Sequence, residues 1–202
     1  RQEIHTQEVS EEQRSHGCVT HCLMTEGVCN MNNAIYLEAE RLRKKYNTRD
    51  PFELLEAANV VVDFTREFPK NGLKGFCTII NRTRYVVINA RLCEEEQRVV
   101  AGHEAGHIIL HMNDLKIGAF KDSDIYQAKS KKEREANFFS ADFLISDDEV
   151  LDAMKACDAN FFTVAHALYI PEPFFAFKLY SMVERGYSMK MPVELDNTFL
   201  AN

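Results

Sequence analysis

The sequence predicts an α+β fold, with a small sheet near the middle of the chain and helices before and after it. Strand-forming runs occur between residues 60 and 89, whereas the flanking segments carry helical periodicity. The chain has 202 residues, 46% of them hydrophobic, which suffices for one compact domain with a small appendage. We therefore expect one main domain whose sheet has about three strands.

Composition divides the chain into four segments. Met31 opens a helical stretch that resembles a natural domain start, so residues 1–30 are expected to form an N-terminal extension, either flexible or foreign to the natural domain. The main domain is expected over residues 31–147, and a C-terminal helical region over residues 148–187. Residues 188–202 form a tail.

Two helices should precede the sheet. Apolar residues at helical spacing predict an amphipathic helix from Asn33 to Tyr46. Asp50 and Pro51 then supply the N-cap and the first position of a second helix, which runs through Ala58. We expect both helices to pack against the sheet.

Three β-rich runs follow these helices. Residues 60–64 form a strong strand, and residues 76–80 and 85–89 form two more. The last two are joined through residues 81–84, which indicates a hairpin. Which strand lies at an edge of the sheet stays open at this point.

The segment from Glu94 to Met112 is expected to be a buried helix. It opens with three acidic residues, which a helix N-terminus favours, and continues into a long apolar run without proline. Apolar residues lie nearly all round it, as in the central helix of a small domain. Gly106 in its interior costs about 1 kcal/mol relative to alanine, so another segment should pass close there.

This helix carries the pentapeptide His103-Glu104-Ala105-Gly106-His107. Residues four apart share a helix face, so His103 and His107 can bind one ion, and Glu104 lies beside it, where a carboxylate can deprotonate a bound water. Buried without a partner, these groups would cost on the order of several kcal/mol. The spacing therefore predicts a catalytic zinc site; the alternative is two core histidines bonded to backbone carbonyls, with Glu104 in a salt bridge.

A catalytic zinc site needs a third protein ligand besides its exchangeable water. His111 continues the spacing, but three histidines over two turns converge poorly, so we expect it to support a ligand from behind or to pack at the helix end. A second helix over residues 131–145 offers Glu133 and Glu135. Glu133 is the predicted ligand, because Glu135 points with Asp142 towards a charged, wet side. Glu135 remains the alternative.

The face of Glu133 explains this choice. Its neighbours on the helix surface are mostly small, which would let the helix approach the histidine-bearing helix closely. They are Ala136, Asn137, Ser140 and Leu144. Asn137, one turn further on, can accept the free ring N–H of a ligating histidine and so fix its tautomer.

Together, His103 to His107 and the later run Glu133-Arg-Glu-Ala-Asn137-Phe-Phe-Ser-Ala-Asp-Phe-Leu144 resemble the ImmA/IrrE family of metallo-endopeptidases. The resemblance extends over about Met31 to Tyr187. It implies a minimal zincin-like domain: a small sheet, the His-Glu-x-x-His helix, a helix with the third ligand, and a C-terminal helical region. One departure is the run Leu144-Ile145-Ser146-Asp147, where many members have Leu-Met-Pro.

The resemblance also implies a site and a function. One zinc ion would be held by His103, His107 and Glu133, with Glu104 as the catalytic glutamate. Zincin-like proteases pair a substrate backbone with an edge strand beside the zinc helix. The implied activity is cleavage of a helix-turn-helix transcriptional repressor, encoded nearby, which derepresses mobile-element, phage or stress genes.

The C-terminal region is expected to be helical over residues 149–157, 161–168 and 171–185. The last two segments have the outline of a helix-turn-helix motif. The final helix offers mainly aromatic and apolar side chains, with Lys178 and Arg185 as its only cations, so it should pack or grip protein and not read bases. His166, in the preceding helix, should be a packed histidine; a role as transition-state donor stays open.

Charge and cysteine usage narrow the setting. No long apolar run and no secretion-type N-terminus occur, so we expect a cytoplasmic protein without a membrane span. The net charge of −7 argues against direct nucleic-acid binding. Cys77, Cys93 and Cys157 lie among apolar neighbours and should be buried, reduced thiols.

Two further alternatives remain. Cys18, Cys22 and Cys29 cluster with two histidines in the N-terminal extension, but their spacing fits no standard zinc module, so a chance cluster is favoured. The whole domain can also be interpreted as a binding module that holds a repressor or an antitoxin-like partner, with zinc as a structural clamp. A fourth protein ligand, from His111, His166 or a cysteine of the N-terminal cluster, would indicate the clamp.

Overall fold

The structure is a computed structural model that describes residues 31–116, 131–156 and 160–189 of the 202-residue chain. The expected N-terminal extension, with its cluster of Cys18, Cys22 and Cys29, lies outside the described residues. So do Cys157 and most of the expected tail, residues 190–202.

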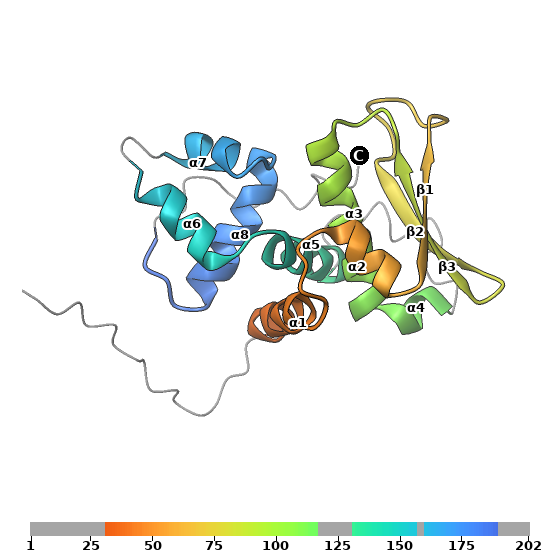
Figure 1. Cartoon of the computed structure of the whole chain (residues 1–202), viewed down its shortest axis with the longest axis horizontal. Coiled ribbons are helices and arrows are strands. Elements are labelled where there is room, and N and C mark those ends of the chain that lie inside the picture. Colours follow the sequence, from red (N-terminus) through yellow and green to blue (C-terminus); the bar gives the residue numbers. More distant parts are fainter. Residues whose placement is uncertain (1–30, 117–130, 157–159, 190–202) are drawn as a thin grey trace, which may run out of the picture.

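Helices and strands follow the order that the sequence predicts, and the fold is α+β (Figure 1). The elements are α1 (Met31–Tyr46), α2 (Pro51–Ala57), β1 (Val60–Thr65), β2 (Gly75–Ile80), β3 (Thr83–Asn89), α3 (Glu94–Leu110), α4 (Met112–Lys116), α5 (Lys131–Leu144), α6 (Asp147–Met154), α7 (Phe161–Ala167) and α8 (Glu172–Glu184). None of the described helices is long and apolar enough to cross a membrane.

The predicted start of α2 is confirmed. Asp50 is its N-cap, and the Asp50 carboxylate accepts a hydrogen bond from the backbone N–H of Phe52 at 2.8 Å. Pro51 occupies the first helical position, where its missing N–H is not needed.

The sheet has three strands in the order β1-β3-β2, so β3 is central. β3 runs parallel to β1 and antiparallel to β2. The hairpin between β2 and β3 is tighter than predicted, because only Asn81 and Arg82 form the turn. Both have positive φ, 50° and 69°, as a two-residue type I′ turn requires. Asparagine tolerates this conformation better than most residues.

One edge of β2 is unpaired among the described strands. The backbone carbonyl of Lys74 accepts a hydrogen bond from the backbone N–H of Asn89 at 2.9 Å. From this pair on, hydrogen-bonded and non-hydrogen-bonded residue pairs alternate along β2 and β3. The backbone N–H and C=O groups of Gly75, Cys77 and Ile79 therefore point away from β3, towards the open edge.

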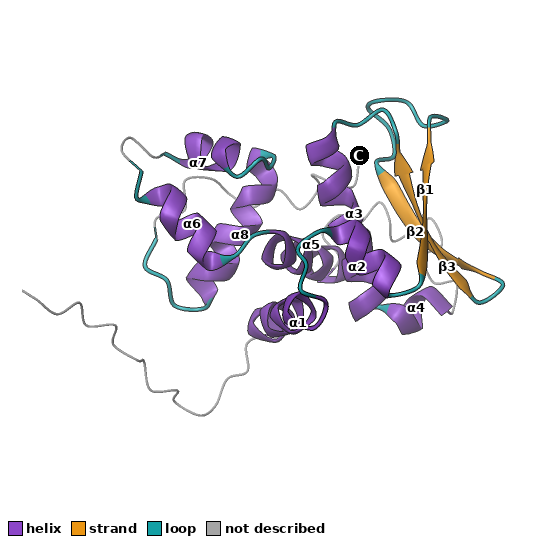
Figure 2. Ribbon diagram, in the orientation of Figure 1, coloured by secondary structure: helices purple, strands orange, loops and turns teal. Residues whose placement is uncertain are grey.

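Helices cover one face of the sheet (Figure 2). α2 packs on β1, and α3 packs on β2 and β3. Val60, Val86 and Ile88 point to this side and are buried, whereas Val61 on the opposite side is 46% exposed. The sheet thus supports α3 from one side only.

α5 lies at the centre of the helical part, between α3 on one side and α8 on the other, with α1 also packed against it (Figure 1). α8 is largely buried: its apolar side chains belong to the same hydrophobic core as those of α3 and α5. The C-terminal helices are therefore packed directly against the helix that carries the predicted third ligand.

A buried network of charges joins α5 to α8 and α6. The Lys178 ammonium, fully buried, lies 2.9 Å from Asp142 and 2.7 Å from Asp147. Asp142 also accepts a hydrogen bond from the hydroxyl of Ser181 at 2.6 Å. The prediction that Asp142 faces water is wrong, since its side chain is 0% exposed. Helical periodicity identified its face but not the helix that covers it.

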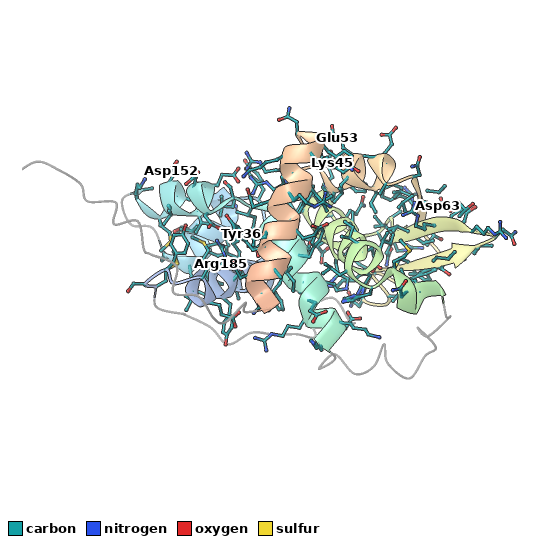
Figure 3. The ribbon with its side chains drawn as sticks, turned by 90° about the horizontal axis from the view of Figure 1, so that it is seen from below. Tyr36, Lys45, Glu53, Asp63, Asp152 and Arg185 are labelled. Carbon is teal, nitrogen blue, oxygen red and sulfur yellow. The ribbon has the colours of Figure 1, made fainter. Side chains whose placement is uncertain are left out.

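Arg185 completes this network from the end of α8. Its guanidinium donates to Asp147 at 2.8 Å and lies 3.6 Å from the ring centre of Tyr36 on α1 (Figure 3). Burial and the Asp147 charge raise the pKa of Tyr36 to about 12. Burial would raise the pKa of Asp147, but Arg185 and Lys178 hold it well below its usual range.

Candidate metal centre

The predicted pentapeptide lies in the buried middle of α3. His103, Glu104 and His107 are 5%, 6% and 4% exposed. Gly106 lies against α5, where a side chain placed on it would meet the Cα atom of Ala136 at 3.0 Å. This is the close approach that a glycine inside the helix predicts, and it brings the two helices together beside the histidines.

Three ligand atoms converge between α3 and α5. The Nε2 atoms of His103 and His107 are 3.0 Å apart. The carboxylate oxygens of Glu133 lie 3.2 Å from Nε2 of His103 and 3.3 Å from Nε2 of His107. Ligands about 2.0–2.1 Å from a tetrahedral zinc ion lie roughly 3.3 Å from one another, so the observed spacing suits such an ion.

Hydrogen bonds behind the histidines indicate how their rings are protonated. Nδ1 of His103 lies 2.9 Å from the amide oxygen of Asn137, which can only accept, so this Nδ1 carries the proton. Nδ1 of His107 lies 3.2 Å from Nδ1 of His111. The contact between His103 and Asn137 is the one that the sequence predicted.

With its proton on Nδ1, His103 turns the lone pair of Nε2 towards His107 and Glu133. Burial would lower the pKa of His103, but the hydrogen bond and charge of Glu133, together with Glu104, raise it. Burial would raise the pKa of Glu133, yet its bonds to His103 and His107 hold it well below the usual range. Both pKa shifts have the same cause, the close contact of the histidine rings with the Glu133 carboxylate. Two histidines and one carboxylate are residues that fit a divalent cation.

Glu104 lies beside this cluster, on the side of strand β2. A side chain placed on Gly75 would come 3.8 Å from its Oε1 atom, so the strand passes close to the carboxylate. Burial and the charge of Glu104, to which the Cys77 thiol hydrogen-bonds, raise the pKa of Cys77 well above its usual value. The open edge of β2 therefore lies next to the carboxylate that the sequence assigned to catalysis.

His111 and Glu135 form a pair behind the cluster. Nε2 of His111 lies 2.8 Å from Oε2 of Glu135, and Oε1 of Glu135 lies 3.7 Å from the Lys131 ammonium. The prediction that Glu135 points to a wet side is wrong: its side chain is 17% exposed and turned to His111. Glu135 is thus placed behind a histidine and not among the three converging atoms.

The remaining predicted side chains lie elsewhere or differ from expectation. His166, expected to be a packed histidine, is exposed on α7, and α7 itself packs against α6 and α8. Cys93, expected to be buried, is exposed at the start of α3. Sequence reasoning missed Cys77 and Gly75 as neighbours of Glu104. Residues 75 and 77 are two apart on a strand, so they lie on the same face of β2, the face that meets α3. This spacing could have identified them only if the position of β2 beside α3 were known.

Comparison with known proteins identifies the family to which this sequence is similar. Residues 56–180 match the family model of the IrrE N-terminal-like domain, a peptidase family. A protein of Bacillus phage phi105, named uncharacterized immunity region protein 2, is 34% identical over 111 residues. That alignment covers 54% of this chain and 66% of the phage protein. The family match contains β1 to α7 and most of α8, including all the residues of the converging cluster.

Proposed function

The chain belongs to the ImmA/IrrE family of metallopeptidases, and from this membership we propose that it is a zinc-dependent endopeptidase with a minimal zincin-like core. The observation that carries the proposal is the convergence of His103, His107 and Glu133, whose ligand atoms all lie within 4.8 Å of one another. Two histidines and one carboxylate are a ligand set of catalytic zinc sites.

The mechanism assigns a separate task to each of these side chains. A bound zinc ion supplies Lewis acidity, which makes water a nucleophile near neutral pH and polarises a carbonyl group. Glu104, held beside the cluster, takes the proton from the attacking water. The same carboxyl group then gives this proton to the amide nitrogen that leaves, so that one residue serves as base and then as acid.

The open edge of β2 is the proposed binding site of the substrate peptide. Gly75, Cys77 and Ile79 offer backbone donors and acceptors there, so an extended peptide can add as a further strand. Gly75 has no side chain, and a Cβ atom there would meet Val100 of α3 at 2.5 Å, so β2 lies close against the helix that carries Glu104. Recognition through the backbone is largely indifferent to the substrate's side chains.

The proposed substrate is a helix-turn-helix transcriptional repressor encoded near this protein, whose cleavage would derepress mobile-element, phage or stress genes. The immunity-region name of the phage relative supports this setting. Such a substrate places the action in the cytoplasm.

Residues 31–147 are the proposed catalytic domain, and residues 148–187 its helical support. α7 and α8 keep the order of a helix-turn-helix motif. However, Phe174, Phe175 and Phe177 of α8 are fully or almost fully buried, which favours a role in packing over one in reading DNA.

The alternative function is that of a zinc-stabilised binding module, which holds a repressor or an antitoxin-like partner without cutting it. This function would require a metal site closed by a fourth protein ligand. Within the described residues, His111 turns its ring nitrogens to His107 and Glu135, and His166 is exposed on another helix. Neither of these two histidines supplies a fourth ligand, which supports the enzyme over a clamp closed by either of them; Cys18, Cys22 and Cys29, the other candidates for a fourth ligand, lie outside the described residues.

The decisive variant is Glu104→Gln. Glutamine keeps the shape of the side chain but cannot take a proton from water, so we expect full zinc content and a loss of cleavage of at least about 100-fold. The measurement combines zinc analysis with cleavage of the adjacent helix-turn-helix regulator, followed by gel electrophoresis and mass spectrometry. Undiminished cleavage by the variant would refute the mechanism, and zinc binding without cleavage by the unaltered protein would favour the binding module.

A further inference from the structure

We propose that Glu135 and His111 form a relay that fixes the ring of His107 for metal binding. The proposal rests on the proposed function, because it takes His107 as a metal ligand. It gives two residues outside the converging cluster a positioning role: His111, which follows α3, and Glu135 on α5. Neither would touch the metal or the substrate.

The relay consists of two hydrogen-bond contacts that join two buried histidines to a partly buried carboxylate. Nδ1 of His107 lies 3.2 Å from Nδ1 of His111, and Nε2 of His111 lies 2.8 Å from Oε2 of Glu135. The side chains of His107, His111 and Glu135 are 4%, 6% and 17% exposed. Little water can therefore compete for these hydrogen bonds.

The chain of contacts permits one arrangement of protons when His107 binds a metal. Its Nε2 faces His103 and Glu133, so the metal takes the Nε2 lone pair and the ring proton stays on Nδ1. That proton needs an acceptor, so Nδ1 of His111 must carry a lone pair. His111 then has its own proton on Nε2, where Glu135 accepts it.

The two metal-binding histidines are thus held in different ways. His103 donates to Asn137, a neutral amide, whereas His107 is the start of a chain that ends on a carboxylate. A carboxylate behind a histidine orients the ring and makes it a more basic ligand. The side chain that sequence periodicity assigned to the wet side of α5 therefore acts on the metal centre through His111.

The relay also depends on how α3 ends. His111 is the C-cap of α3, with φ −121° and ψ 23°, and its backbone N–H still donates to the carbonyl of His107 at 2.9 Å. The ring consequently stays one turn beyond His107, next to it, while the chain turns into α4. Glu135 meets it from α5, two residues after the ligand Glu133.

The test measures the zinc dissociation constant of the full-length protein by competition with a chromophoric chelator. Glu135→Gln keeps an acceptor but removes the charge, and His111→Phe keeps the volume but removes both nitrogens. We expect zinc affinity to fall about 10-fold in Glu135→Gln and about 10- to 100-fold in His111→Phe, the range for residues that support a ligand from behind. His111→Gln, whose amide can accept and donate in place of the ring, should restore part of the affinity.

Two controls separate the relay from a packing effect. Glu38→Gln removes the charge of a paired glutamate on the surface of α1 and should leave zinc affinity unchanged. The double variant His111→Phe with Glu135→Gln should bind zinc as His111→Phe does, because a relay that is already broken cannot be broken again. Melting temperatures of the metal-free proteins show whether each variant folds.

A spectroscopic readout tests the relay in the unaltered protein. Ring ¹⁵N–¹H spectra of the zinc-loaded protein should place the proton of His107 on Nδ1 and that of His111 on Nε2. A proton on Nδ1 of His111, unchanged zinc affinity in the folded variants, or additive losses in the double variant would overturn the relay. Failure of the unaltered protein to bind zinc would overturn the proposed function, and the relay with it.

Discussion

At the scale of single residues, two glutamates of α5 have different partners because they lie on different faces of the helix. Glu133 and Glu135 are two residues apart, which on a helix means about 200° of rotation. Glu133 meets Nε2 of both histidines of the pentapeptide, whereas Glu135 meets His111 behind them. In the proposed site the same chemical group would therefore bind the metal directly in one case and act through a histidine in the other.

Removing each carboxylate should have different consequences for zinc. Glu133→Ala deletes the proposed third ligand, so we expect loss of zinc during dialysis against a weak chelator. Glu135→Ala leaves all three ligands in place and should retain one zinc ion per chain under the same conditions, although with weaker binding. Zinc analysis after dialysis is the measurement, and retention by Glu133→Ala with loss by Glu135→Ala would move the third ligand to Glu135.

Sequence reasoning identified the residues whose positions on one helix face follow from spacing alone. His103, His107 and the shared face of Glu133 and Asn137 follow from the 100° step of a helix. Glu135 and Asp142 were assigned to water because periodicity groups residues by face but does not tell what covers that face. In the folded protein Glu135 contacts His111 and Asp142 contacts Lys178, and both partners lie outside α5.

At the scale of elements, the contact of α3 with α5 sets the distance between the side chains of the candidate metal centre. Gly106 of α3 and Ala136 of α5 meet there, three residues from Glu133. A second small contact lies one turn earlier, where Gly102 meets Ser140, whose hydroxyl donates to the carbonyl of Val99 at 3.2 Å. These contacts leave no space for larger side chains between the helices.

Gly106→Leu should therefore push the two helices apart. We expect a loss of about 2 kcal/mol or more in the free energy of unfolding, because added volume at a packed contact forces the backbone to shift. Zinc affinity should fall as well, since Glu133 moves with α5. Urea unfolding of the metal-free protein is the measurement. Ala34→Leu, which adds similar volume at an exposed position of α1, is the control, and equal stability of both variants would contradict the close contact.

Most elements could be predicted from local signals, but their pairing could not. Capping by Asp50 and Pro51 marks α2, and β-branched runs mark the strands. The parallel pairing of β1 with β3, which leaves β2 at an edge, joins residues more than 20 positions apart and depends on packing against α3. No local pattern contains that information.

At the scale of the whole molecule, the buried charges between α5, α6 and α8 hold the C-terminal helices to the core. Lys178→Met should lower the free energy of unfolding by about 3–5 kcal/mol, because Asp142 and Asp147 lose a buried partner. Thermal or urea unfolding is the measurement. Lys155→Met breaks a pair of similar length on the exposed surface of α6 and should leave stability unchanged; similar losses in both would contradict the role of burial.

The same network predicts how stability depends on pH. The pKa of Asp147 is lowered in the folded protein, so its contribution is complete above about pH 4, the unfolded value, and is lost as the pH falls through the folded pKa. We expect the wild-type protein to lose stability steeply below about pH 4, and Asp147→Asn to lose less over that interval. Urea midpoints measured across this range provide the test. Parallel curves for the two proteins would show that another group governs acid unfolding.

α5 takes part in both of these systems. Glu133 near its start contacts His103 in the candidate metal centre, and Asp142 near its end is paired with Lys178 of α8. Glu133 and Asp142 are nine positions apart, which corresponds to about 13 Å along the helix axis. A tilt of about 5° around the Asp142 end would displace Glu133 by about 1 Å, enough to change a catalytic rate by roughly 100-fold. The C-terminal helices thus hold the far end of α5 in place, and a shift of these helices would displace Glu133, the proposed third ligand.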